Sequence, residues 1–261
     1  MIEFIHGNCT KVLWDRYKRE APFHFAFLDP PFNIGQDYSD HDDKMSRKDF
    51  LIMIGNAISA VSCNMVDGGV IALHGPDDLA EIYLDKCPRR SLTRIAWINW
   101  HYRFGQCNKS NWIDARCHCL IYKKGDAPHT WNPEDVLVPS DRATVYNDKR
   151  IHDTDGGGSR LPGTVWGVPS DGPYWGRVQG NSRERQPDCP NQLPEKYLER
   201  LIKAYTNPGD LILDPFCGSG TTAVVADALD RNCITIDVSQ RCLDVAQDRV
   251  LRGAVRVDRL P

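Results

Sequence analysis

A glycine-bearing turn late in the chain has the residues needed to bind a nucleotide. The apolar segment Leu211 to Leu213 runs into DPFCGSGTT, residues 214–222, and a helical pattern follows. Glycines let a ligand approach the backbone, and the first turn of a helix offers free N–H groups. Asp237 comes one helix and one strand later, where an acid can hold ribose hydroxyls. We therefore expect a nucleotide site here, although an ordinary tight turn is the alternative.

The details of this turn narrow the class of ligand. No lysine follows Gly220, so the turn is not the phosphate-binding GxxxxGK[ST] pattern, and Thr221-Thr222-Ala223 does not complete GxGxxG. Asp214, directly after the strand, suits a positive amino group rather than a pyrophosphate. S-adenosylmethionine has such a group and a sulfonium besides, so we expect it to be the cofactor. The expected contacts in this part of the chain are Asp214, Pro215, Phe216, Gly218, Ser219, Gly220, Thr221, Thr222 and Asp237.

A second turn, Asp29-Pro30-Pro31-Phe32, has the residues needed to activate an amine. It ends the apolar run Phe23 to Leu28, and sites in α/β proteins lie at the carboxyl ends of strands. The exocyclic amine of a base is a poor nucleophile, because its lone pair is delocalised into the ring. A carboxylate and a backbone carbonyl that accept its two protons would direct the lone pair outward, and the prolines stiffen the turn. Phe32 can stack on the base. We predict that these four residues are catalytic; a rigid structural turn is the alternative.

Strands and helices alternate around both turns. Besides the two strands already named, strands are predicted over Ile2 to His6, Val70 to Leu73, Ser91 to Asn99, Arg116 to Tyr122 and Cys233 to Ile236. Helices are predicted over Phe50 to Met65, Pro76 to Lys86, Leu198 to Tyr205, Thr221 to Arg231, and from Ser239, as the cap, to about Arg252. This alternation predicts an α/β fold with a mostly parallel sheet covered by helices. Residues 33–46 lack periodicity and are predicted to form a mobile loop.

Residues 125–190 interrupt the alternation. They hold nine Gly and eight Pro among 66 residues, which predicts a long insert of turns and short strands rather than more of the sheet. The chain is therefore expected to consist of a catalytic half over 1–124, this insert over 125–190, and a cofactor-binding half over 191–261.

The two turns together resemble a known family. Asp29-Pro30-Pro31-Phe32 resembles the (D/N/S)PP(Y/F/W) motif of amino-methylating DNA methyltransferases, and DPFCGSGTT resembles their cofactor motif. The catalytic motif comes first and the insert lies between the two, which resembles the β group of these enzymes. The resemblance implies a class I methyltransferase (Rossmann-like) fold with helices on both faces of the sheet, circularly permuted, and an insert that recognises the target. It also implies a double-stranded DNA substrate with a flipped target base, and homodimers occur in the family.

The resemblance extends to further segments. Pro190 to Pro194 (PNQLP) resembles the family's final cofactor-side motif, with Leu193 where a lysine often stands and Cys189 where a histidine often opens it. Gly7-Asn8-Cys9 resembles a segment near the cofactor adenine, with Asn8 in place of an acid. Gln192, Leu193 and Asn8 are therefore expected to contact the cofactor. Trp97 to Trp100 resembles the strand that helps to line the target-base pocket.

A basic and aromatic stretch predicts contact with nucleic acid. Residues 87–124 carry eight basic side chains, one acid and six interleaved Trp, Tyr and Phe residues. Phosphate contact and base stacking require such a combination; a solvated edge with core aromatics is the alternative. The insert is balanced in charge, but its arginines could read base edges. The expected DNA contacts are Arg103, Lys109, Trp100, Tyr102, Arg160, Arg177 and Arg183.

Composition excludes several other classes of protein. The 261 residues are 41% hydrophobic and carry a net charge of −3, which argues against a disordered tail and against histone-like binding through bulk charge. No apolar run is long enough to span a bilayer, and the N-terminus lacks a signal peptide, so we expect a soluble, cytoplasmic protein without a membrane partner. The ten cysteines form no CxxC pair and are interpreted as reduced, mostly buried thiols. No metal is expected, and His41, Asp42 and Asp43 are interpreted as part of a mobile acidic loop.

The sequence therefore predicts an enzyme that transfers a methyl group from S-adenosylmethionine to the N6 of adenine in DNA, as in restriction–modification systems. Within the family, Asp in the first motif position favours adenine N6, and Ser favours cytosine N4. Cytosine-N4 methylation is the first alternative. An RNA or protein amino-methyltransferase, a catalytically silent cofactor-binding subunit and a P-loop nucleotidase are weaker alternatives. The permuted motif order and the long insert argue against the first, the intact Asp29-Pro30-Pro31-Phe32 against the second, and the missing lysine against the third.

Overall fold

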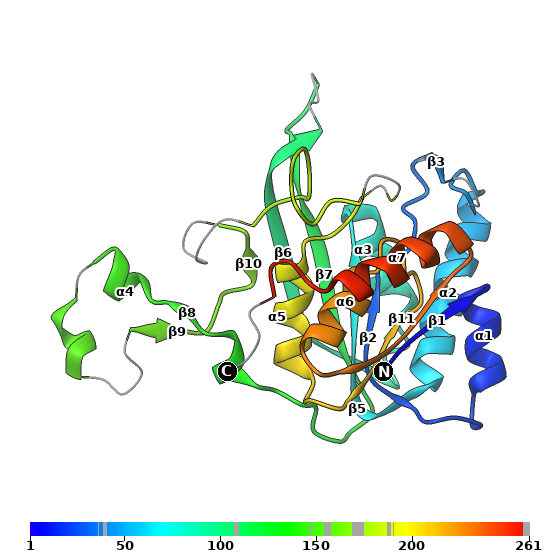
Figure 1. Cartoon of the computed structure of the whole chain (residues 1–261), viewed down its shortest axis with the longest axis horizontal. Helices are drawn as coiled ribbons and strands as arrows, with labels where there is room; N and C mark the ends of the chain where they lie inside the picture. The colour runs from blue at the N-terminus through cyan, green and yellow to red at the C-terminus, as the bar shows by residue number, and fades with distance from the viewer. Residues whose placement is uncertain are drawn as a thin grey trace.

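A twisted central sheet organises the computed structural model, which describes residues 1–35, 37–38, 41–106, 110–146, 148–153, 158–168, 175–186, 189 and 191–257. Over these residues the main sheet has eight strands in the order β1-β12-β11-β2-β5-β7-β6-β10 (Figure 1). The strands are β1 (Ile2–His6), β2 (Phe23–Leu28), β5 (Met65–Gly75), β6 (Leu92–Gln106), β7 (Asp114–Lys124), β10 (Val165–Trp166), β11 (Leu211–Asp214) and β12 (Asn232–Asp237). Every pairing is parallel except those of β7, so the predicted mostly parallel sheet is confirmed.

Strand β2 brings the two motifs to the same place, because it pairs in parallel with β11. Phe25 lies opposite Ile212 and Ala26 opposite Leu213. Both strands therefore end at the same edge of the sheet, where Asp29 follows one and Asp214 ends the other. Segments separated by about 185 residues along the chain become neighbours through this single pairing.

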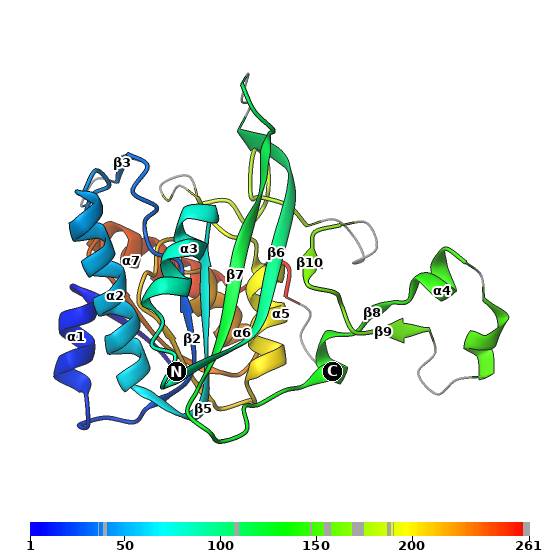
Figure 2. The same cartoon turned by 180° about the vertical axis from the view of Figure 1, so that it is seen from behind.

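Helices cover both faces of the sheet. Helices α1 (Cys9–Arg16), α2 (Arg47–Cys63) and α3 (Asp77–Lys86) lie on one face (Figure 2), and α5 (Glu195–Tyr205), α6 (Thr221–Ala228) and α7 (Gln240–Arg252) on the other. From Phe25 onward, both sides of strand β2 are apolar. Phe25 and Phe27 pack with α5 and α6, whereas Ala26 and Leu28 pack with α1, α2 and α3. A strand segment that is buried on both faces must be apolar on both, and the one polar residue of β2, His24, is only partly buried.

Most predicted elements are present with modest changes of boundary. The predicted α2 stripe of Phe50, Ile54, Ile58 and Val61 is buried, but Met65 opens β5 instead of ending the helix. The Ser239 Oγ atom accepts a hydrogen bond from the Cys242 N–H, which confirms this residue as the cap of α7.

The insert departs from the prediction, because part of it joins the main sheet. Val165 and Trp166 of β10 pair with Asn99 and Trp100 of β6, and Trp166 packs against Tyr197 of α5. Two residues are too few to show a periodicity in sequence. Among the other short elements of the insert, η1 (Pro133–Val136) packs against α5. The elements β8 (Val138–Pro139), α4 (Asp141–Thr144), η2 (Lys149–Asp153) and β9 (Ser159–Arg160) form an arm that projects to the left in Figure 1.

The segment predicted to be an irregular loop also contains structure. Strands β3 (Asp37–Tyr38) and β4 (His41–Asp42) form a small antiparallel pair. Among the helices of the described ranges, none is long and apolar enough to cross a membrane.

We expect Gly220→Ala to lower the free energy of unfolding by about 2 to 4 kcal/mol, because it adds strain and overpacks a tight contact. Gly220 has φ +74°, and an added Cβ would lie 2.5 Å from the Cβ of Ala246 on α7. Urea denaturation measures the change. Gly218→Ala is the matched control: its φ of +48° adds strain, but nothing lies within 4 Å of its added Cβ. Equal losses in the two variants would contradict the contact with α7.

Candidate active site

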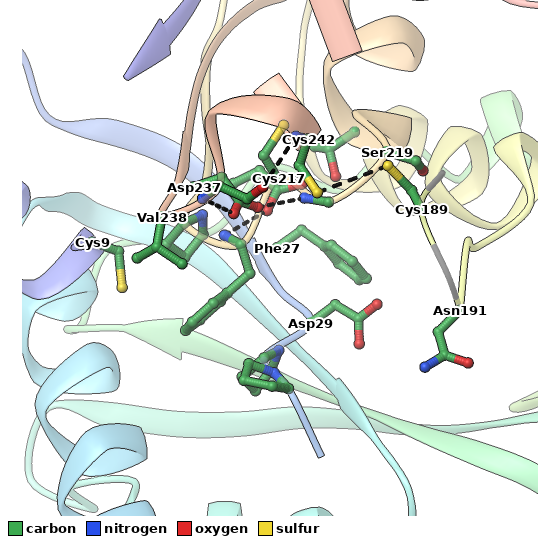
Figure 3. Close-up of a pocket in the computed structure, with 18 of the residues that line it drawn as sticks. Cys9, Phe27, Asp29, Cys189, Asn191, Cys217, Ser219, Asp237, Val238 and Cys242 are labelled. Carbon is green, nitrogen blue, oxygen red and sulfur yellow. Dashed lines mark hydrogen bonds between the residues drawn. The ribbon is translucent and has the colours of Figure 1, made fainter. Parts of the chain in front are cut away.

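A cavity of about 610 Å³ opens at the carboxyl edge of the sheet where β2, β11 and β12 end (Figure 3). It collects nearly all the residues predicted to be catalytic or to bind the cofactor. Those lining it are Asn8, Asp29, Pro30, Pro31, Phe32, Gln192, Leu193, Asp214, Pro215, Phe216, Gly218, Ser219, Thr221, Thr222 and Asp237. Gly220 is not a lining residue; it serves the close packing of α6 against α7. Met45, Met53, Cys189, Asn191, Arg241 and Cys242 also line the cavity. Cys189 and Asn191 belong to the segment that resembles the final cofactor-side motif, whereas no local signal marked the other four.

The carboxylate of Asp29 has an unused hydrogen-bonding position at this cavity. Its Oδ1 atom is buried and accepts no hydrogen bond from the described residues. Burial, and secondarily the charge of Asp214, raises the pKa of Asp29 to about 8. A buried acceptor without a donor is costly, so this atom is suited to a ligand that donates an N–H.

Asp214 is a second buried acid, on the adjacent strand. Burial raises its pKa to about 7, although hydrogen bonds from the Thr222 side chain and the Phe216 N–H partly offset this. The Phe216 N–H donates to Asp214 Oδ1 over 3.0 Å. Two neighbouring acids that resist ionisation favour a cationic ligand, because a positive charge between them would restore both to their charged forms. The ammonium and sulfonium groups of S-adenosylmethionine fit this arrangement.

Asp237, predicted to hold ribose hydroxyls, also fixes two turns of the backbone. Its Oδ2 accepts the Gly218 N–H over 2.8 Å, and its Oδ1 accepts the Ser239 N–H over 2.9 Å. The contact with Gly218 ties the end of β12 to the cofactor turn.

The chain just after the turn predicted to be catalytic, residues 29–32, is held by Asn33 and Asp43, which the sequence did not mark as supports. Asp43 Oδ1 accepts the Asn33 N–H over 2.8 Å, and Asp43 Oδ2 accepts the Ile34 N–H over 3.1 Å. The Asn33 side chain exchanges two hydrogen bonds with the backbone of Met45. Asp43 is 3% exposed, so the interpretation of this acid as part of a mobile loop is wrong. The side chains of His41 and Asp42 lie outside the described residues.

A buried ionic network holds the cofactor turn. Arg249 Nη1 donates to the Ser219 carbonyl over 3.1 Å and to Thr221 Oγ1 over 2.9 Å. Arg249 Nη2 donates to Glu195 Oε1 over 3.0 Å, and the N–H of Glu195 donates to Glu184 Oε2 over 2.7 Å. All three charged side chains are almost completely buried. The network joins α7, the start of α5 and the end of the insert, and no local sequence signal marks it.

The aromatic residues beside the cavity are core residues rather than an exposed face. Trp100 is 2% exposed and Tyr102 is 9% exposed, which contradicts the expectation that both stack on DNA from a surface. Trp100 packs against His74 and Tyr197. The His74 Nδ1 atom lies 2.9 Å from the Tyr197 hydroxyl, and burial lowers the pKa of His74 to about 3. The His74 ring of this aromatic cluster also contacts Phe27, which lines the cavity.

The basic residues expected to contact DNA are dispersed. Arg177 lies over the Tyr102 ring with its guanidinium carbon 5.3 Å from the ring centre, and Arg160 is 3.5 Å from Asp141 in the insert arm. Arg103 and Arg183 are exposed. Lys109 lies outside the described residues.

The sequence Cys117-His118-Cys119 places a histidine between two cysteines, and the structure shows what this histidine contacts. Trp97 Nε1 donates to His118 Nδ1 over 3.0 Å, so the other ring nitrogen carries the proton and donates to Asp77 Oδ1 over 2.7 Å. Arg116 donates to the same carboxylate. His118 is thus engaged at both nitrogens, and no group of three or more potential metal ligands occurs within the described part of the chain.

Comparison with known proteins places this geometry in a family. The family model described as DNA methylase, for N6 and N4 enzymes, matches residues 23–248. The chain therefore belongs to the DNA methylase family. It is 30% identical to the type II methyltransferase M1.MboII of Moraxella bovis over 92% of each chain. It is 27% identical to the DNA adenine methyltransferase YhdJ of Escherichia coli over 86% of this chain and 74% of that one.

Solved structures share the fold. The M1.HpyAVI–SAM complex superposes with a TM-score of 0.66 at 18% identity, covering 96% of this chain and 99% of the other. The cytosine-N4-specific PvuII DNA methyltransferase gives 0.67 at 13% identity, covering 97% and 93%. The expected class I methyltransferase fold is thereby confirmed.

We expect Asp29→Asn to stabilise the ligand-free protein more at pH 8.5 than at pH 5. The pKa of Asp29 rises from 3.8 to about 8 on folding. Between these values the folded chain binds the extra proton, so the contribution of Asp29 to stability falls as the pH rises. Asparagine cannot ionise, so the variant avoids the loss of stability that comes from burying a charged carboxylate at high pH. Thermal unfolding at both pH values measures it, with the exposed Asp78→Asn as control; a shift that does not depend on pH would contradict the buried carboxylate.

We expect Arg249→Met to weaken cofactor binding at least tenfold, about 1.4 kcal/mol, because the cofactor turn loses its side-chain support. Arg249→Lys should restore part of the affinity. Isothermal titration with S-adenosylmethionine measures binding, and circular dichroism verifies folding. Arg252→Met on the same helix is the control, since Arg252 contacts Asp248 and Gln186 rather than the turn. Equal affinities in the Arg249→Met and Arg252→Met variants would contradict this role.

Proposed function

We propose that this protein transfers a methyl group from S-adenosylmethionine to the exocyclic N6 of adenine in double-stranded DNA. The observation that carries the proposal is the buried Oδ1 atom of Asp29, which has no donor among the described residues, on a residue that lines the same cavity as the cofactor motif. The target base would be flipped out of the duplex to reach it, because a base stacked inside a duplex is inaccessible to a buried carboxylate.

The residues of the site would act mainly by positioning the amine. Asp29 and the Pro30 carbonyl would accept its two N–H groups, and Phe32 would stack on the base. The bound cofactor supplies the electrophilic methyl group. A positive charge in the cavity lowers the pKa of Asp29, which keeps the carboxylate ionised and able to accept. The network around Asn33 and Asp43 would hold the chain just after the catalytic turn in place, and such positioning supplies much of the rate in reactions of this type.

The choice of adenine rests on the first residue of the catalytic turn. The resemblance associates Asp at this position with adenine N6, and the relative YhdJ is named an adenine methyltransferase. Cytosine N4 is the second candidate, because the cytosine-N4-specific PvuII enzyme has the same fold. Both amines present the same two protons to Asp29 and Pro30.

The position of the β6–β7 hairpin supports DNA as the substrate. Strand β5 ends at Gly75 opposite His118, whereas β6 continues to Gln106 and β7 begins at Asp114. The hairpin therefore extends past the edge of the sheet at which β2 and β11 end (Figure 1). Near its tip, Trp112 is 89% exposed and Ile113 is 56% exposed. With the insert of residues 125–190 as the target-recognition region, between a catalytic half (1–124) and a cofactor half (191–261), DNA would lie across this edge.

The first test is to incubate the protein with S-adenosylmethionine and unmethylated genomic DNA and to analyse the nucleosides by mass spectrometry. We expect N6-methyladenine. N4-methylcytosine would overturn the choice of base. If the protein binds the cofactor but yields no methylated nucleoside, the result would favour an RNA or protein substrate or a silent-subunit role.

The Asp29→Ala variant should lose more than about a thousandfold in methylation rate while binding the cofactor within a few-fold of wild type, since several interactions of the transition state are lost together. Full activity of this variant would contradict the mechanism.

We expect Trp112→Ala to raise the Kd for duplex DNA about tenfold, because loss of one exposed aromatic contact removes roughly 1 to 3 kcal/mol. Fluorescence anisotropy with a labelled duplex measures the change. Trp14→Ala is the control, since Trp14 is another exposed tryptophan but lies on α1. Unchanged DNA affinity in the Trp112→Ala variant would place the DNA away from this hairpin.

A further inference from the structure

Two thiols from distant segments meet in the wall of the cavity. The Sγ atoms of Cys189 and Cys242 are 3.8 Å apart, and both residues line the cavity (Figure 3). Neither is in a disulfide; Cys189 is buried and Cys242 is partly exposed. No catalytic role proposed above uses either thiol.

The two thiols have different surroundings, which gives each a different chemical role. Cys242 lies in the first turn of α7, next to the cap Ser239 that accepts its N–H. The start of a helix stabilises a thiolate. Cys189 is the hydrogen-bond donor of the pair, and this contact together with burial raises its pKa. A helix-terminal thiol beside a protonated partner is the arrangement found where one cysteine is oxidised and a second resolves it.

We propose that Cys189 and Cys242 form a modification site at which a peroxide converts the two thiols into a disulfide in the cofactor cavity. The Cys242 thiolate attacks one peroxide oxygen, the O–O bond breaks, and with one proton the products are Cys242 sulfenic acid and water. The Cys189 sulfur then attacks the sulfenic sulfur. Its proton and the departing hydroxide form a second water, so two thiols are oxidised and one peroxide is reduced. An S–S bond of about 2.05 Å requires the sulfurs to approach by less than about 2 Å.

The disulfide would change the cavity because its two ends belong to different walls. Cys189 precedes Gln192 and Leu193, which line the cavity, and Cys242 belongs to the helix that Asp237 and Ser239 lead into. A covalent link would fix these walls to each other, so that they cannot part to admit the cofactor. We expect the Kd for S-adenosylmethionine to rise at least about fivefold on oxidation, because the closed form of the cavity no longer opens. This effect rests on the cavity being the cofactor site, whereas formation of the bond does not.

The experiment oxidises the full-length protein with low concentrations of hydrogen peroxide and maps disulfides by non-reducing peptide mass spectrometry. We expect a Cys189–Cys242 peptide, slower formation in the presence of S-adenosylmethionine, and recovery of cofactor affinity with dithiothreitol. Titration calorimetry reads cofactor binding even if no methylation is detected, so failure of the proposed function remains distinguishable. Each variant is compared with its own reduced form.

Matched variants isolate the pair. Cys189→Ser and Cys242→Ser should each abolish the cross-linked peptide and the loss of affinity. Cys217→Ser, which removes a third thiol of the same cavity, and Cys63→Ser, which removes an exposed thiol on α2, should retain both. Oxidation of Cys63 without a Cys189–Cys242 peptide would overturn the proposal. So would a disulfide that leaves cofactor affinity unchanged, or an inactivation reversed by a chelator rather than by dithiothreitol.

Discussion

The burial of two like-charged acids at the ends of adjacent strands is the constraint on which the site depends. Asp29 and Asp214 lie side by side because β2 and β11 are paired, and burial raises the pKa of both. By itself this arrangement is unfavourable, since two carboxylates compete for the same low-dielectric space. A bound cation and an N–H donor would together offset this unfavourable burial, the first by its charge and the second by a hydrogen bond. The protein therefore carries in its cavity an electrostatic preference for the two partners that the proposed reaction brings together.

The surrounding structure holds this unfavourable arrangement in place. Asn33 and Asp43 fix the chain just after the catalytic turn, and Arg249 fixes the cofactor turn through Ser219 and Thr221. Each support is a polar group whose hydrogen bonds are satisfied within the protein, so it adds rigidity without leaving a further buried group unpaired. Catalysis by positioning needs this rigidity, because small displacements of the reacting groups are costly in rate.

The insert of residues 125–190 contacts both the central sheet and the ionic network of Arg249. Its end supplies Glu184 to the network of Arg249 and Glu195, and β10 extends the sheet beside Trp100. A segment proposed to recognise DNA is therefore connected, through Glu195 and Arg249, to the turn that is proposed to hold the cofactor. The arm that carries β8, α4 and β9 instead projects from the body of the protein, where it can reach a large substrate.

The sequence by itself determined the succession of strands and helices along the chain, both turns and the class of chemistry, because these depend on local signals. The run from Phe23 to Leu28 predicted a buried strand, and the residue types of each turn predicted what it could bind. Only the tertiary structure decided that Trp100 and Tyr102 belong to the core, that Asp43 supports the catalytic turn, and that Arg249 reaches Ser219. It also decided that two residues of the insert complete the sheet. These features depend on contacts between residues far apart in the chain, and periodicity and turn chemistry report only on near neighbours.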